Sequence, residues 1–326
     1  MKDGEDITRT RFRVHPALAG YRLDQFLMRM IPRLSRNRIQ KAISDRVRLS
    51  WDAPVKPSTP VREGGEVIIE SPHPEEAAID FDPVVLYEDE DLLAIDKPPG
   101  LVVHPTHNHL RNTVISLLRR RRGEDTLALA HRLDAETSGV LMLTRHRWAA
   151  RKVQTAFERG RVRKHYLAVV FGRPPEDTFT CRQPLGYHSV DTVVYRQSPL
   201  ADRTRECETR FRVLRRVGRM SLVEAELLTG RRHQIRAHLA LEGYPVVGDK
   251  LYGLEDRQVR QYLHAGMELD EALRERLGAD RCQLHCHSMV FTHPRRERGE
   301  IVVRAEMPAD MVATLESGST TAEDSP

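Results

Sequence analysis

A short proline-rich, acidic stretch divides this chain of 326 residues into two parts with different sequence patterns. It covers residues 71–80 and begins Ser71-Pro72-His73-Pro74-Glu75-Glu76, a composition typical of a linker. Before it, apolar residues recur at helical spacing, and after it short β-rich runs alternate with helices. We therefore expect a polar lead-in (1–19), a small domain (20–70), the linker, a large domain (81–306) and a partly disordered C-terminal tail (307–326).

The small domain has the pattern of two amphipathic helices followed by short strands. The first helix has an apolar stripe at positions i, i+3, i+4, i+7 and i+8, made of Leu23, Phe26, Leu27, Met30 and Ile31. The second helix is capped by Ser35 and has a buried side of Ile39, Ala42 and Ile43. Short strands are expected around Val47 and at 67–69.

Positive charge is concentrated in this domain. Residues 22–48 hold eight basic and two acidic residues, a net charge of +6 that exceeds the +5 of the whole chain. Arg36 and Arg38 lie in the first turn of the second helix, where the backbone dipole is already positive. A bound phosphate would relieve that conflict. We therefore favour contact with nucleic acid over a solvated charged surface.

The type of basic residue also favours contact with nucleic acid. Of the 52 basic residues, 45 are arginine, whose planar fork matches phosphate oxygens. A composition bias of the source genome would give the same count, so the position of the arginines has to decide.

The large domain is expected to be built around a β-sheet. Strands are predicted at 84–87, 92–96, 101–103, 166–171, 211–214, 222–228, 289–291 and 301–303. Helices are predicted at 112–120, capped by Asn112, and at 148–157. Runs of strands with intervening helices predict an α+β domain with a mainly antiparallel, mixed β-sheet flanked by helices.

A polar loop between two apolar strands is the first candidate for chemistry. It runs from His131 to Gly139 and carries Asp134 next to an arginine and near two hydroxyls. An aspartate in a turn is usually a turn former or a helix cap. The functional alternative is a carboxylate that acts as a nucleophile or base and is kept ionised by a neighbouring cation.

The basic segment 230–238 is the second candidate. It follows the strand 222–228 through a tight turn, and Ile235 and Leu239 have helical spacing. The simplest interpretation is a basic surface helix. If one of its arginines, Arg231, Arg232 or Arg236, contacts Asp134, the ion pair will hold the pKa of Asp134 low.

Together these segments resemble the RluA family of pseudouridine synthases. The motifs are His131-Arg132-Leu133-Asp134-x-x-Thr137-Ser138-Gly139, Lys164-x-Tyr166, Gly230-Arg231-x-His233-Gln234-Ile235-Arg236-x-His238 and Val247-Gly248-Asp249-x-x-Tyr252-Gly253. Tyr87-Glu88-Asp89 and the run from Lys97-Pro98-Pro99-Gly100 to His104-Pro105 extend the resemblance upstream. It covers residues from about 20 to about 305.

The small domain is similar to the S-four-like RNA-binding domain of ribosomal and RNA-modifying proteins. The similarity rests on Arg22-Leu23-Asp24, Ser35-Arg36, the helix ending near Ile43 and the Gly65-Glu66 turn. Asp45-Arg46 and Ser50-Trp51-Asp52 depart from that family at two turns. This domain ahead of a catalytic part resembles the RluC and RluD branch, whose usual target is large-subunit ribosomal RNA.

The resemblance implies an isomerase that needs neither a cofactor nor a metal. Asp134 would be the catalytic residue and form a covalent adduct with the target nucleoside, so that uracil detaches, rotates and rejoins through carbon. Arg132 would fill the gap left by the extruded uridine, Tyr166 would lie against the uracil, Ile235 would be an apolar wall and Arg236 would pair with Asp134. The expected RNA contacts of the small domain are Arg22, Ser35, Arg36, Arg38 and Lys41.

Three features stand outside the resemblance. The stretch 202–209 keeps only Thr209 of the family's Gly-Lys-x-Ala-x-Thr pattern, which leaves its RNA contacts open, and the charged stretch 254–280 has no assigned role. Cys282 and Cys286, with His285 and His287 nearby, have the residue types of a zinc site. Alternation along a strand would put Cys286 and the two histidines on opposite faces, so we expect no metal there.

Composition excludes other classes of protein. No apolar run is longer than about five residues, far short of the roughly 20 that cross a bilayer, and four cysteines are too few for a disulfide scaffold. We expect a cytoplasmic monomer whose partner is RNA, with large-subunit ribosomal RNA as the first choice of substrate. The alternatives are transfer RNA as substrate, or a catalytically idle RNA-binding or ribosome-assembly factor.

Overall fold

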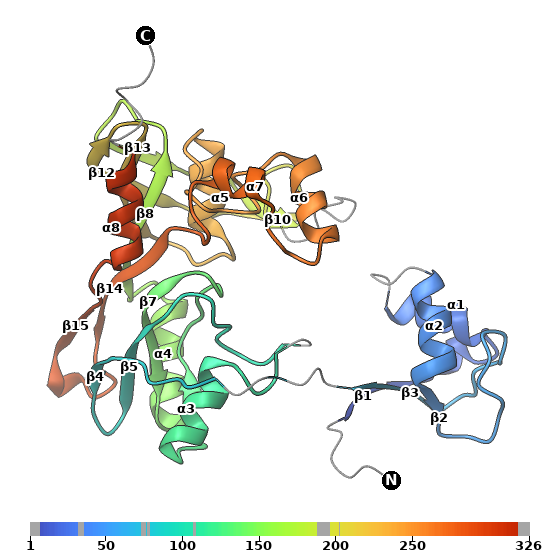
Figure 1. Cartoon of the computed structure of the whole chain (residues 1–326). Coiled ribbons are helices and arrows are strands. Elements are labelled where there is room, and N and C mark those ends of the chain that lie inside the picture. Colours follow the sequence, from blue (N-terminus) through green and yellow to red (C-terminus); the bar gives the residue numbers. More distant parts are fainter. Residues whose placement is uncertain are drawn as a thin grey trace. The chain divides into compact units, whose positions relative to one another are not determined.

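The computed structural model describes residues 7–31, 36–72, 76, 79–106, 109–187, 196–201 and 203–318. The chain forms two compact units, Met1–Ala77 and Ala78–Pro326, which are described separately (Figure 1). Within the described ranges, no helix is both long enough and apolar enough to cross a membrane.

The N-terminal unit combines two helices with a small antiparallel sheet. Its elements are β1 (Ile7–Arg13), the 3-10 helix η1 (Pro16–Leu18), α1 (Leu23–Met30), α2 (Arg36–Arg46), β2 (Val47–Leu49) and β3 (Glu66–Pro72). The strand order is β1-β3-β2. The predicted helical stripe is largely confirmed, because Leu23, Phe26 and Leu27 are buried together with Ile39 and Ile43.

The strand β1 lies within the residues that we expected to be a polar lead-in. It pairs with β3 along its whole length, from Ile7 to Arg13. Arginine alternates with Thr10 and Phe12 here, which is the two-residue period of a strand. Val14, which follows the strand, is 1% exposed and belongs to the core of the unit. The arginines favoured the interpretation of this segment as solvent-exposed and irregular. Its pairing partner, the edge of β3, is distant in sequence and leaves no local pattern.

The large unit contains twelve strands and seven helices within its described residues. The strands are β4 (Val85–Glu88), β5 (Leu92–Lys97), β6 (Ala128–Leu129), β7 (Ser138–Thr144), β8 (Arg163–Phe171), β9 (Thr178–Cys181), β10 (Leu185–Tyr187), β11 (Arg203–Arg205), β12 (Thr209–Val217), β13 (Met220–Leu227), β14 (Leu284–Thr292) and β15 (Glu300–Arg304). The helices are α3 (Val114–Arg122), α4 (Arg147–Glu158), α5 (Gln234–Leu241), α6 (Asp256–His264), α7 (Glu271–Leu277), the 3-10 helix η2 (Arg296–Arg298) and α8 (Ala309–Ser317).

Ten of these strands form one mixed sheet. Its order is β4-β5-β7-β14-β8-β13-β12-β9, with β15 beside β14 and β6 beside β7. Every pairing is antiparallel except that of β14 with β7. Helix α4 lies along β7, and α8 lies along β8 and β13 (Figure 1). The predicted mainly antiparallel, mixed sheet flanked by helices is confirmed.

Two details of this unit differ from the sequence-based expectations. Residues 101–103, which were predicted to be a strand, lie outside the strands, and Thr113 rather than Asn112 caps α3 by accepting a hydrogen bond from the Ser116 backbone. Helix α8 occupies part of the range that we expected to be a tail. Its Met311 and Leu315 are buried against the sheet, so this segment completes the core instead of leaving it.

The close approach of β7 and β14 requires a glycine. Gly139 has a φ of 104°, and a Cβ atom there would lie 2.3 Å from the carbonyl oxygen of Cys286. Only glycine tolerates both the conformation and the contact. This glycine therefore fixes the point at which the loop before β7 enters the middle of the sheet.

Candidate active site

The loop before β7 and the start of α5 meet at a pocket of about 550 Å³. All five residues expected to act on the substrate line it: Arg132 and Asp134 from the loop, Tyr166 from β8, and Ile235 and Arg236 from α5. The structure thus brings together residues separated by about a hundred positions in the sequence, and their roles remain predictions.

Asp134 belongs to a chain of charges that runs from the interior to the pocket. Asp249 is fully buried, and its two oxygens lie 2.6 and 2.7 Å from Nε and Nη2 of Arg236. Backbone N–H groups of Leu251 and Tyr252 also donate to Asp249. The remaining terminal nitrogen of Arg236, Nη1, donates to Oδ2 of Asp134 at 3.0 Å. Asp249 therefore orients the guanidinium that faces Asp134.

The environment of Asp134 keeps its carboxylate ionised. Burial raises the pKa of Asp134, but the positive charges of His233 and Arg236 outweigh burial and hold the pKa below its ordinary value. Burial also lowers the pKa of His233 to about 4, so at neutral pH Arg236 supplies the charge. The Asp134 side chain is 25% exposed, and among the described residues its Oδ1 accepts no hydrogen bond. One oxygen is thus available to a substrate.

Two buried side chains hold the backbone of the Asp134 loop. Lys97 is fully buried, and its Nζ donates to the carbonyl oxygens of Pro98, Ala135 and Thr137 at 2.7, 2.8 and 2.9 Å. Burial lowers its pKa to about 7. On the other side of Asp134, Nε2 of His131 accepts a hydrogen bond from the backbone of Met142 at 3.1 Å. The loop is therefore anchored on both sides of the carboxylate.

The rest of the pocket combines an apolar wall with polar groups. Ile235 and Tyr166 are 3% and 6% exposed. Burial raises the pKa of Tyr166 well above its ordinary value, so the phenol stays protonated at neutral pH. Arg132 is exposed at the pocket, and Lys164 lines it beside Phe157. A planar, partly apolar group such as a nucleobase suits these walls.

Sequence reasoning missed three residues of this site. Asp249, Lys97 and His233 all stand in motifs that were noticed, but no role was assigned to them. His233 has a φ of 54° just before α5, and its Nε2 lies 3.7 Å from the Asp134 carboxylate. The missing signal is burial, since a buried charge demands a partner and sequence alone does not show which charges are buried.

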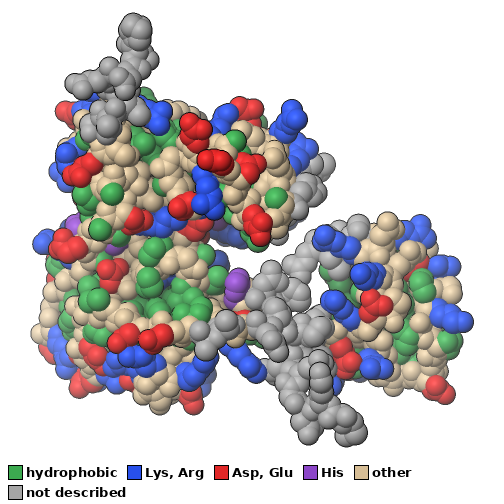
Figure 2. Space-filling model, viewed as in Figure 1, with side chains coloured by type: hydrophobic (Ala, Val, Ile, Leu, Met, Phe, Trp, Pro, Cys, Tyr) green, Lys and Arg blue, Asp and Glu red, His purple; other side chains and the backbone are tan. Residues whose placement is uncertain are grey.

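Three of the expected RNA contacts of the N-terminal unit lie on α2, and a fourth directly precedes α1. Arg22 precedes α1 and binds the buried Asp24 through two nitrogens, at 3.1 and 3.0 Å. Arg36, Arg38 and Lys41 are exposed on α2, and Ser35 lies outside the described residues. Basic side chains are numerous on the face of this unit that Figure 2 shows.

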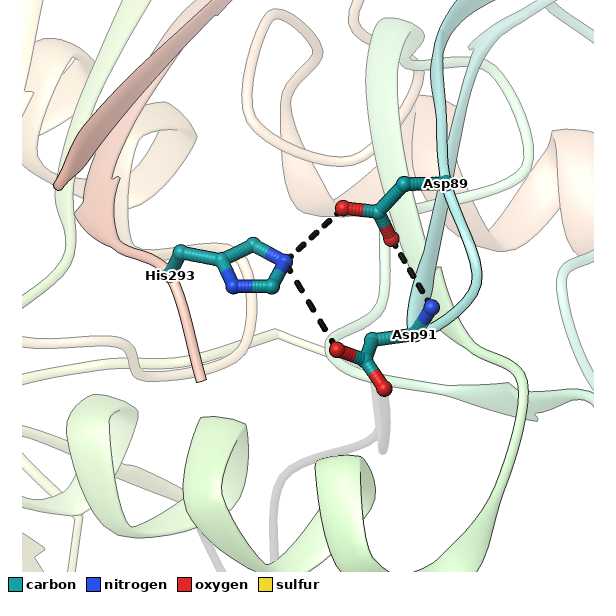
Figure 3. Close-up of side chains that lie close together, drawn as sticks. All are labelled: Asp89, Asp91 and His293. Carbon is teal, nitrogen blue, oxygen red and sulfur yellow. Dashed lines mark hydrogen bonds and ion pairs between the residues drawn. The ribbon is translucent and has the colours of Figure 1, made fainter. Parts of the chain in front are cut away.

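A group of possible metal ligands lies elsewhere in the large unit. In the described part of the chain, one set of three such side chains comes together: Asp89, Asp91 and His293, here named the β4–β5 cluster (Figure 3). His293 donates to Asp89 at 2.8 Å, while Arg298 also binds Asp89 and Arg295 binds Asp91. Since cations of the protein already neutralise both carboxylates, this cluster serves as an ion-pair network.

The two cysteines considered as zinc ligands contact side chains of the active-site region. Cys282 lies 3.8 Å from a carboxylate oxygen of Asp249, and Cys286 contacts Tyr166. Burial raises the pKa of both thiols, to about 12 for Cys286, which disfavours the thiolate that binds metal.

Comparison with known proteins identifies the family. The RNA pseudouridylate synthase profile matches residues 91–241. The chain is 36% identical to an uncharacterized RNA pseudouridine synthase of Chloroflexus aurantiacus, over 93% of this chain and 91% of that protein. It is 32% identical to ribosomal large subunit pseudouridine synthase D of Pseudomonas aeruginosa, over 85% and 86% of the two chains. The structure of human RNA pseudouridylate synthase domain containing 4 matches 73% of this chain and 93% of its own length, with a TM-score of 0.54 and 25% identity. The chain therefore belongs to the RluA family of RNA pseudouridine synthases.

Proposed function

We propose that this enzyme isomerises specific uridines of large-subunit ribosomal RNA and that Asp134 is its nucleophile. The observation that carries the proposal is the Asp134 carboxylate, which lines the pocket, is held ionised by Arg236 and has one oxygen without a hydrogen bond among the described residues. The name of the Pseudomonas aeruginosa relative supports the choice of RNA. Transfer RNA remains the alternative substrate.

The pocket residues have matching tasks in this proposal. Asp134 forms a covalent adduct with the target nucleoside, the bond between ribose and N1 of uracil breaks, a bond from ribose to C5 forms, and the bond to Asp134 breaks again to restore the carboxylate. The proton on C5 leaves and N1 gains one, so the reaction is an isomerisation. Tyr166 and Ile235 contact the uracil, Arg236 stabilises the carboxylate, and Arg132 takes the space of the extruded nucleotide.

Release of tritium from C5 of uracil tests the reaction. Wild-type protein should release tritium from labelled ribosomal RNA, and Asp134→Asn should release none while still binding the RNA. Asp125→Asn, which changes an exposed carboxylate outside the pocket, is the matched control. Release from transfer RNA alone would favour the alternative substrate. No release from either RNA, with binding intact, would indicate an RNA-binding or assembly factor.

For the N-terminal unit, we propose an S-four-like RNA-binding domain that adds β1 and Val14 to the expected residues 20–70 and runs to the end of β3, so that the expected linker 71–80 begins after Pro72. Support comes from the exposed basic side chains of α2. The triple variant Arg36→Ala/Arg38→Ala/Lys41→Ala should weaken RNA binding and reduce its salt dependence, by about 0.7 to 0.9 in the logarithmic slope for each lost phosphate contact. Arg62→Ala, an exposed arginine of the same unit, is the control. Equal affinity of the triple variant and the control would contradict this assignment.

We also propose that the protein is a cytoplasmic monomer. The proposed location rests on the proposed substrate, because a bacterial relative is named as a pseudouridine synthase of the large ribosomal subunit. Size-exclusion chromatography with light scattering tests the monomer, and fractionation of cells tests the location.

A further inference from the structure

A second hollow lies next to the catalytic pocket and is strongly basic. This groove has a volume of about 840 Å³, and the residues that matter for its chemistry are Tyr187, Gln197, Arg203, Arg205, Arg231 and Arg232. Tyr187 ends β10, and Arg203 and Arg205 bound β11, its antiparallel partner. Arg231 and Arg232 also line the catalytic pocket, so the two hollows share a wall.

The described residues that line the groove include four arginines and no carboxylate. All four arginines are exposed, and in the described part of the chain none of them forms an ion pair with a carboxylate. Arg232 instead donates to the hydroxyl of Tyr187 at 3.1 Å. On the neighbouring sheet the arrangement is different, since Arg212 pairs with Glu224 at 2.9 Å. Exposed arginines without acidic partners create a positive potential that attracts a polyanion.

A buried amide of the groove lacks a partner among the described residues. Gln197 is only 7% exposed, and no acceptor in the described ranges binds its Nε2. Buried donors are almost always paired in folded proteins, so an orphan donor that lines a groove indicates an acceptor supplied by a ligand. The backbone nitrogen of Gln197 donates to the Tyr252 hydroxyl at 2.8 Å, and this hydroxyl lies 3.2 Å from Nδ1 of His233 in the catalytic pocket. The groove and the Asp134 site are thus in direct contact.

An exposed aromatic ring completes the groove. Tyr187 is 44% exposed, and the guanidinium carbon of Arg232 lies 5.9 Å from its ring centroid. An aromatic ring among arginines is the combination with which proteins bind single-stranded nucleic acids, because bases stack on the ring while phosphates meet the cations.

We propose that this groove binds a nucleotide of single-stranded RNA adjacent to the target uridine. Its base stacks on Tyr187 and accepts a hydrogen bond through a carbonyl oxygen from Nε2 of Gln197, while Arg203 and Arg205 hold the phosphates. The proposal rests on the proposed function and deepens it, because it assigns recognition of the sequence next to the modified uridine to these residues. It also gives a role to the stretch 202–209, which departs from the family pattern.

Binding of the full chain to a fluorescently labelled ten-nucleotide oligouridylate tests the proposal without requiring the natural target. Tyr187→Ala should weaken binding roughly tenfold, whereas Tyr187→Phe, which keeps the ring, should bind like wild type. Arg203→Ala/Arg205→Ala should lower the logarithmic salt slope by about 1.4, that is about 0.7 for each phosphate contact. Gln197→Leu should weaken binding about threefold. Arg151→Ala, an exposed arginine of α4, is the matched control.

The groove proposal would be overturned if Tyr187→Ala and Arg203→Ala/Arg205→Ala kept the affinity and the salt slope of wild type. It would also be overturned if their loss of affinity were no larger than that of Arg151→Ala. Thermal unfolding of each variant separates lost contacts from lost folding. Tritium release on ribosomal RNA is measured with the same wild-type preparation. Tritium release by wild type, together with wild-type RNA affinity in the groove variants, would reject the groove proposal and leave the enzyme function standing. Weaker RNA binding by the variants, without tritium release by wild type, would reject the proposed function and leave the groove as an RNA-binding site.

Discussion

Two clusters of the large unit are built from the same types of side chain, aspartate, histidine and arginine. They differ in how many of their carboxylate oxygens accept hydrogen bonds. In the β4–β5 cluster, both oxygens of Asp89 and both oxygens of Asp91 accept hydrogen bonds from tyrosine, backbone, histidine or arginine donors. In the active site, Asp134 accepts from Arg236 through one oxygen within the described residues. The comparison teaches that a saturated carboxylate stabilises the fold, whereas chemistry requires an ionised carboxylate with a free lone pair.

Removing the cation of the active site should have the largest effect. Arg236→Gln leaves Asp249 buried without its partner, which should cost about 3 to 5 kcal/mol of unfolding free energy. It should also lower kcat by roughly 10² to 10³, the usual effect of losing one electrostatic contact to the reacting group. Urea unfolding and tritium release measure the two effects.

A double variant separates these effects. Arg236→Met/Asp249→Leu replaces the buried ion pair with apolar groups, and should recover most of the stability because such replacements are often neutral. Its kcat should stay low, since Asp134 still lacks its cation. Recovery of kcat together with stability would show that Arg236 acts only through folding.

In the β4–β5 cluster the corresponding change should affect stability alone. Asp91→Asn breaks contacts to Arg295 and His146, and because both partners reach solvent the cost should be about 2 kcal/mol. The kcat of the folded variant should stay within about twofold of wild type. A tenfold decrease in kcat would mean that this cluster also takes part in the reaction and would break the comparison.

Acid should reveal the contribution of Asp89. Burial opposes its ionisation, but Tyr87 and backbone donors lower its pKa to about 2, below the value of about 3.9 in an unfolded chain. A depressed pKa contributes stability that is complete above about pH 4 and disappears as the pH falls toward 2. We expect Asp89→Asn to lack about 2 kcal/mol of that pH-dependent stability. Parallel unfolding curves of variant and wild type between pH 5 and 3 would contradict this.

The smallest effect concerns Lys97. With a pKa of about 7, Lys97 loses one of its three N–H donors as the pH rises, and two of these donors bind the Asp134 loop, so activity should fall roughly threefold between pH 6.5 and 9. Because this pKa lies below that of an unfolded lysine, stability should rise over the same range. Lys97→Arg, which stays protonated, should remove the alkaline decrease in activity. A decrease that persists in this variant would assign the titration to another group.

Local sequence pattern was sufficient for most elements that carry the site. The strands β7 and β8 follow from short apolar runs, and the helix α5 follows from the four-residue spacing of Ile235 and Leu239. The strand β1 was not predicted, because it is stabilised by backbone pairing with the edge of β3, nearly sixty residues away. Partner strands distant in sequence leave no local pattern.

The same division holds for the site. Asp134 and Arg236 could be singled out as carboxylate and cation, yet their contact spans 102 positions and came from family resemblance, not from spacing. Asp249 and Lys97 were overlooked because their importance comes from being buried. Family motifs mark which residues matter, and the packed structure shows what each one does.

The place of β14 in the sheet has a consequence for how the protein is made. This strand, Leu284–Thr292, lies between β7 and β8, which are synthesised more than a hundred residues earlier. On a growing polypeptide the half of the sheet next to Asp134 and the half next to Arg236 have no strand to join them until β14 has emerged. Pairings this remote in sequence form late and slowly. The strand that joins the two halves of the pocket is therefore made after both of them, and the nascent chain carries Asp134 and Arg236 well before β14 can fix them on one sheet.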